Sequence, residues 1–115
     1  MTGPSVMTRI ALSMGGSRAA VELDLDDTPA GRSLLDHLPL IITLDDYAGA
    51  EKVSTPTRAL STDGAPDGYQ PSAGDLTYYA PWGNLALFYR DAPWARGLVR
   101  LGEVHSGLDR LAGLE

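Results

Sequence analysis

The chain has 115 residues, a formal net charge of −6 and no cysteine. This length forms one domain with a single core, and the lack of cysteine excludes a disulfide framework and thiolate zinc sites. The negative charge disfavours nucleic acid and anionic membranes as partners, and no apolar run approaches the ~20 residues that a membrane-spanning helix needs.

The first residues of the chain carry no basic region ahead of an apolar run, so we expect no targeting segment. We expect residues 1–5 to be a disordered N-terminal segment and residues 6–115 to form a single domain. Together with the missing thiols, this favours a soluble cytoplasmic protein.

An opening β-hairpin is predicted from two alternating segments. Apolar and polar side chains alternate over residues 6–14, and again from Ala19 to Leu25. Gly15-Gly16 between them favours a tight turn. Because the second segment interleaves Glu22 and Asp24 with its apolar residues, one of its faces is expected to be wet or to lie at a sheet edge.

A short helix and a short strand are predicted next. Thr28-Pro29 supplies an N-cap followed by proline at the first helical position, and Pro39 stops the segment. The run Leu40–Leu44 has the length of a buried strand, whereas Asp45–Gly49 has the composition of a turn. From Glu51 to Pro71, prolines and glycines predict short strands joined by exposed loops.

The segment Gly74–Arg90 is predicted to form one β-hairpin, and it holds five of the eight aromatic residues. With a loop over Pro81–Asn84, Tyr78 would face Leu87 on one side of the hairpin. The opposite side would carry Thr77, Tyr79, Ala86 and Phe88. Both faces are apolar enough to be covered.

The C-terminal part predicts a strand over Leu98–Val104, followed by a short helix that a Ser106–Asp109 capping box would open. The residues therefore indicate a mainly β fold with many short strands and two short helices. Such a fold is an antiparallel barrel or a sandwich.

No metal or cofactor site is expected. The Asp24-x-Asp26-x-Thr28 pattern lacks the glycine and glutamate of a calcium loop and instead suits the start of a helix. His37 and His105 are the only histidines, and His37 is expected at a helix end. Nucleotide-binding, nucleophile-elbow and zinc-protease motifs are all missing from the sequence.

Three residues are candidates for catalysis: Glu51, Tyr79 and His105. A carboxylate next to tyrosines in a pocket can have a raised pKa and act as acid or base. The alternative for Glu51 is a surface ion pair with Lys52 or an arginine. Candidate substrate-binding residues, chosen because aromatic rings line apolar pockets, are Tyr47, Tyr78, Trp82, Phe88 and Tyr89. Trp82, at the hairpin turn, would mark where a ligand enters.

The chain resembles the bacterial cyclophilin-like family, small relatives of the cyclophilin barrel. The resemblance is carried by Leu38-Pro39-Leu40, Glu51-Lys52, Ala73-Gly74-Asp75-Leu76, Pro81-x-Gly83-Asn84-Leu85-Ala86-Leu87-Phe88-Tyr89 and Leu101-Gly102-Glu103-Val104. It implies a closed antiparallel barrel of about eight strands with a short helix over each end. It does not imply prolyl isomerase activity, because the chain lacks a Phe-His-Arg run.

Two functions of different classes follow. The chain also looks like the small barrels that act as cyclases in polyketide and polyether biosynthesis, which implies a cofactor-independent cyclase or isomerase for a hydrophobic intermediate. The alternative is a non-catalytic binding module for a peptide or metabolite, or one that forms a homodimer through a strand edge. The first function predicts an open pocket at the aromatic hairpin.

Overall fold

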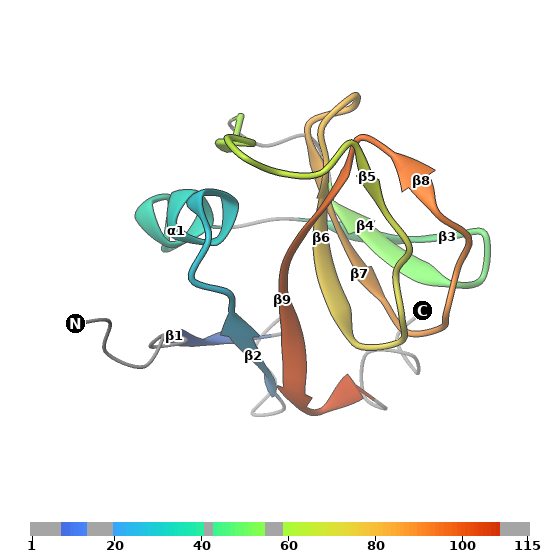
Figure 1. The fold of residues 1–115 in the computed structure, drawn as a ribbon. Coiled ribbons are helices and arrows are strands. Elements are labelled where there is room, and N and C mark those ends of the chain that lie inside the picture. The colour runs from blue at the N-terminus through green and yellow to red at the C-terminus, as the bar shows by residue number, and fades with distance from the viewer. Residues whose placement is uncertain (1–7, 14–19, 41–42, 55–58, 109–115) are drawn as a thin grey trace.

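The computed structural model describes residues 8–13, 20–40, 43–54 and 59–108 (Figure 1). The elements in chain order are β1 (Thr8–Ser13), β2 (Ala20–Leu25), α1 (Pro29–Asp36), β3 (Leu44–Tyr47), β4 (Glu51–Ser54), β5 (Gly68–Tyr69), β6 (Asp75–Tyr79), β7 (Asn84–Phe88), β8 (Ala95–Arg96) and β9 (Leu98–Ser106). The prediction of a mainly β fold with short strands is confirmed.

Seven strands form one antiparallel sheet in the order β1-β2-β9-β6-β7-β4-β3, and β5 pairs with β8 in a second, small sheet. Figure 1 shows the large sheet curving strongly, with α1 at one side and β5 and β8 at the other. Within the described residues no ladder joins the end strands β1 and β3. Closure of the barrel therefore stays a prediction.

The N-terminal elements match the sequence-based expectations. β1 and β2 pair as a hairpin, and Val21, Leu23 and Leu25 are buried while Glu22 and Asp24 remain partly exposed. α1 begins with proline, and the Thr28 Oγ1 atom accepts a hydrogen bond from the Gly31 N–H at 3.1 Å. This is the predicted N-cap. Residues 1–7 and the predicted Gly15-Gly16 turn lie outside the described residues.

The prediction of a turn over Asp45–Gly49 was wrong for its first half. Asp45 and Asp46 belong to β3, and the turn comes after Tyr47. Asp46 is tolerated there because Lys52, directly opposite on β4, places its Nζ 3.2 Å from Asp46 Oδ1. Of the strand predicted over Leu40–Leu44, residues 41–42 lie outside the description and only Leu44 is found in a strand.

The aromatic hairpin forms as β6 and β7, but its predicted register was off by two residues. Tyr78 faces Leu85 rather than Leu87, because the loop is Ala80–Gly83 and Asn84 already pairs with Tyr79. The N–H of Gly83 closes this loop by donating to the Tyr79 carbonyl at 2.8 Å. The predicted division of the arms between two faces is nevertheless confirmed, because a shift of two residues leaves every side chain on its face.

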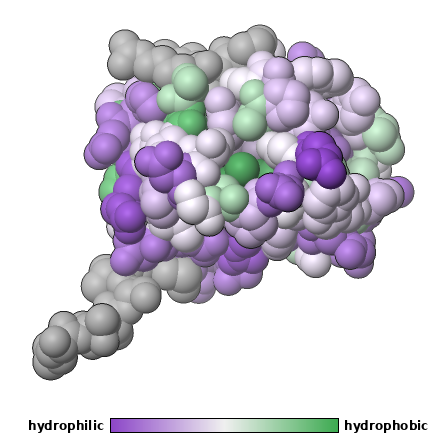
Figure 2. Space-filling view, turned by 45° about the horizontal axis from the view of Figure 1, so that its top comes forward, coloured by the Kyte–Doolittle hydropathy of each residue, from purple (hydrophilic) through white to green (hydrophobic). Residues whose placement is uncertain are grey.

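Both faces of the hairpin carry buried side chains. Leu76, Tyr78, Leu85 and Leu87 belong to the main hydrophobic core, whereas Ala86 and Phe88 form a smaller cluster with Leu98. On the outside, Figure 2 shows hydrophobic residues as separate small patches among hydrophilic ones. No helix in the described part of the chain is long and apolar enough to span a bilayer.

The C-terminal strand is longer than predicted. β9 continues to Ser106, whose Oγ atom lies 3.4 Å from Glu22 Oε1 in β2. The helix that was predicted to follow falls mainly on residues 109–115, outside the description.

Candidate functional site

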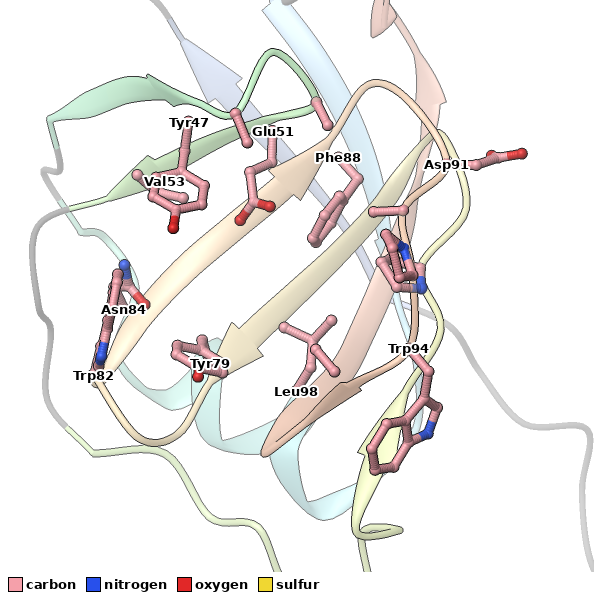
Figure 3. Close-up of a pocket in the computed structure, with 16 residues that line it drawn as sticks. Tyr47, Glu51, Val53, Tyr79, Trp82, Asn84, Phe88, Asp91, Trp94 and Leu98 are labelled. Carbon is pink, nitrogen blue, oxygen red and sulfur yellow. The ribbon is translucent and has the colours of Figure 1, made fainter.

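A cavity of about 490 Å³ lies on the face of the sheet that carries the smaller cluster (Figure 3). Strand pairing places its central side chains together. Glu51 pairs with Phe88, and Tyr79 lies between Asn84 on β7 and Leu98 on β9. Residues directly opposite in neighbouring strands share a face. All five therefore line the cavity.

Three aromatic rings form one end of the cavity. Tyr47 and Tyr79 both stand nearly perpendicular to Trp82, at interplanar angles of 88° and 79° and centroid distances of 6.3 and 5.5 Å. Trp82 and Tyr47 are exposed, at 60% and 49%. These three rings, which all line the cavity, are hereafter called the aromatic corner.

The carboxylate of Glu51 points into the cavity, whereas that of Asp91 points away from it (Figure 3). Burial raises the pKa of the Glu51 carboxyl above its ordinary value. Among the described residues, none makes a hydrogen bond or an ion pair with the Glu51 carboxylate. The surface ion pair with Lys52 that the sequence left open does not form, because Lys52 pairs with Asp46.

A tight turn between β3 and β4 aims Tyr47 and Glu51 at the cavity. Its central residues Ala48 and Gly49 both have positive φ, 55° and 64°, and the Ala50 N–H donates to the Tyr47 carbonyl at 3.2 Å. Turns of this hand match the twist of the two strands they join. Alanine with positive φ is strained, and this strain is located at the cavity wall.

Asn84 is a cavity residue that sequence reasoning assigned to the turn. It is 7% exposed, and its Oδ1 atom is buried without a hydrogen-bond partner in the described structure. Such an unpaired acceptor costs stability. The loop lies one residue earlier than predicted, and this shift moves Asn84 from the turn into a buried strand position. The sequence carries no signal for that shift.

The segment before β9 closes the far side of the cavity. Trp94 packs on Gly68, where a Cβ atom would come within 2.4 Å of the indole ring. The guanidinium of Arg96 lies 5.9 Å from the centroid of the Trp94 ring. A protein cation therefore already occupies this ring, in contrast to the aromatic corner.

Five of the eight sequence-predicted site residues line the cavity: Tyr47, Glu51, Tyr79, Trp82 and Phe88. The other three lie elsewhere. Tyr78 is 3% exposed in the main core, and the Tyr89 hydroxyl donates to Asp46 Oδ1 at 2.6 Å, outside the cavity. His105 is exposed, with its Nδ1 atom 3.0 Å from Arg9 Nη2.

The other end of the same sheet face holds a charge cluster. Arg100 Nε donates to Asp26 Oδ2 at 2.8 Å and Nη1 donates to Asp75 Oδ1 at 3.1 Å. Asp75 also accepts from the Tyr69 hydroxyl at 2.6 Å. These partners raise the pKa of Arg100 and hold it charged. In the part of the chain that is described, no group of three or more acidic or histidine side chains could hold a metal ion.

Comparison with known proteins gives one result. A family model, described as the cyclophilin-like family, matches residues 12–115. Searches among curated proteins and among solved structures returned no match. The match covers the cavity, the hairpin and the sheet apart from the first four residues of β1.

Proposed function

The chain belongs to the cyclophilin-like family, and we propose that it binds a small, largely apolar molecule in the cavity beside the aromatic hairpin. Its sequence lacks the Phe-His-Arg run of the prolyl isomerases. The observation that carries the proposal is the cavity itself: about 490 Å³, with aromatic and aliphatic walls and few polar groups. Ligand sites commonly have volumes of roughly 300–1,000 Å³ and such walls.

The chemistry proposed for this site is a cyclisation or isomerisation that needs no cofactor. The Glu51 carboxylate makes no hydrogen bond or ion pair with the described residues and its pKa is raised, so it can take a proton from an acidic C–H or O–H group and return it to another atom of the substrate. Tyr79 would donate a hydrogen bond, and the rings of Tyr47, Trp82 and Phe88 would hold a reactive conformer. An intermediate of polyketide type has the size and apolar character for this role.

Binding can be tested with an uncharged polarity-sensitive dye. We expect its fluorescence to rise on addition of the protein and the rise to be lost in Val53→Trp, which fills the cavity from β4. Ala59→Trp places the same ring at an exposed position away from the cavity and serves as the control. Equal dye binding by both variants would show that the cavity is not the binding site.

Catalysis is tested by turnover of candidate intermediates. Glu51→Gln is expected to lower kcat by about a hundredfold or more and Tyr79→Phe by less, since general acid–base catalysis contributes roughly 10²–10⁴. Unchanged turnover in both variants would remove the proposed roles of these residues.

The second candidate is a non-catalytic module for a peptide or metabolite, or a homodimer. It is favoured by the position of β3, which ends the sheet and leads directly to Tyr47 at the cavity rim. An extended peptide, or a second copy of this chain, would pair with that edge. Proline at Asp45 would then abolish peptide binding or dimerisation, because it removes a backbone N–H from β3.

A further inference from the structure

The charges around the cavity point to a particular class of ligand. None of the residues that line it in the described structure is lysine, arginine or histidine, whereas Glu51 contributes a carboxylate. The whole chain carries a net charge of −6. The local and the overall electrostatic potential therefore both favour a cation over an anion.

The aromatic corner supplies the second requirement of a cation site. A cation within roughly 6 Å of an aromatic ring centroid is attracted by the π electrons, most strongly for tryptophan. Two walls perpendicular to the Trp82 ring, formed by Tyr47 and Tyr79, surround a ligand from more than one side. The structure records protein cations over Tyr89 and Trp94. It records none over the rings of this corner among the described residues.

Asn84 adds a neutral acceptor to the cavity wall. Asn84 Oδ1 is buried and unpaired in the described structure. A ligand that brings N–H donors would meet acceptors at Asn84 and Glu51, whereas a ligand carboxylate would be repelled by the negative charge of Glu51. Asp91 contributes less to this pattern, because it accepts from the Ala73 N–H at 2.8 Å and points away from the cavity.

We propose that the cavity takes an organic ammonium ion, with its positive nitrogen between the aromatic corner and the Glu51 carboxylate and its apolar body toward Phe88 and Leu98. The inference rests on the proposed function, because it names the class of ligand for the same cavity. The paired cation keeps Glu51 ionised, so that Glu51 acts as an anchor or as a base.

The test compares two probes of equal shape, choline and its uncharged isostere 3,3-dimethylbutan-1-ol, titrated into the full chain and followed by protein NMR shifts. Salt is kept at about 0.15 M, where exposed charges are screened beyond roughly 8 Å. We expect choline to bind about tenfold more tightly than the isostere, with shifts around Trp82 and Glu51. Trp82→Leu and Glu51→Gln should each remove most of this preference.

Asp91→Asn is the matched control for charge, since it also removes one carboxylate from the cavity lining but leaves Glu51 in place. It should retain the preference for choline. Equal loss in Asp91→Asn and Glu51→Gln would assign the effect to diffuse negative charge and overturn the proposal. Equal binding of both probes would also overturn it while the proposed function stands, and failure of both probes and of the dye would overturn both.

Discussion

The two faces of the β6–β7 hairpin differ in the residues that surround them. One face packs Leu76, Tyr78, Leu85 and Leu87 into the main core, which is lined by aliphatic residues from most strands and from α1. The other face combines a small apolar cluster, the charge cluster around Arg100 and an open cavity. The unpaired Asn84 Oδ1 atom and the half-buried Glu51 carboxyl both belong to this second face.

With the proposed function, this difference separates stability from function within one hairpin. The first face is expected to supply most of the hydrophobic free energy, because it removes the larger apolar area from water. The second face holds groups that cost stability in the absence of a ligand. Functional sites in stable folds commonly combine costs of this kind with a well-packed support.

The largest expected effect compares two neighbouring tyrosines on opposite faces. Tyr78→Ala should lower the free energy of unfolding by about 4 kcal/mol, since it deletes a ring from the main core. Tyr79→Ala removes a partly exposed ring at the cavity and should cost about 1 kcal/mol while weakening dye binding. Urea unfolding of both variants measures the contrast. Equal losses in the two variants would mean that the two faces contribute equally to the free energy of unfolding.

The charge cluster gives the next effect. Arg100→Met leaves Asp75, whose side chain is 5% exposed, without its cation. We expect a loss of about 3 kcal/mol in the free energy of unfolding. Arg96→Met removes an exposed arginine that contacts Trp94, and this control should cost about 0.5 kcal/mol or less. A small effect at Arg100 would show that the charge cluster contributes little to the stability of the second face.

The sequence was sufficient for features that local chemistry determines. Alternation predicted β1 and β2, the Thr28 cap predicted α1, and the clustered aromatics predicted the β6–β7 hairpin with its two faces. The cyclophilin-like resemblance was also confirmed. These features depend on neighbouring residues or on period-two patterns, which a single sequence displays.

Features that depend on distant partners were missed. Asp46 lies in a strand because Lys52 and Tyr89 contact it, and both partners come later in the chain. Asn84 is buried because the hairpin loop closes one residue earlier than its composition suggests. The cavity placement of Glu51 follows from its pairing with Phe88, since residue type alone does not determine which strands are neighbours.

A smaller prediction concerns the unpaired acceptor on the second face. Asn84→Val removes the buried Oδ1 atom and places a β-branched residue in a strand. We expect a gain of about 1 kcal/mol in the free energy of unfolding. Asn84→Asp should instead destabilise the protein at neutral pH, because it buries a charge. A loss of stability in the valine variant would show that Asn84 makes a favourable contact in the native state.

The smallest expected effect is the pH dependence of Glu51. Its pKa is raised in the folded state by burial, so the native protein binds more protons than the unfolded chain between the unfolded pKa, about 4.3, and the folded value. Stability due to this group therefore falls as pH rises through that window. Glu51→Gln should be more stable than the wild type at pH near 7, and this gain should vanish in acid below about pH 4. Asp63→Asn makes the same charge change at an exposed site and controls for net charge. A gain for Glu51→Gln that matches Asp63→Asn at every pH would mean that burial of Glu51 does not lower the stability of the protein. At this residue, the second face of the hairpin would then not differ from an exposed surface.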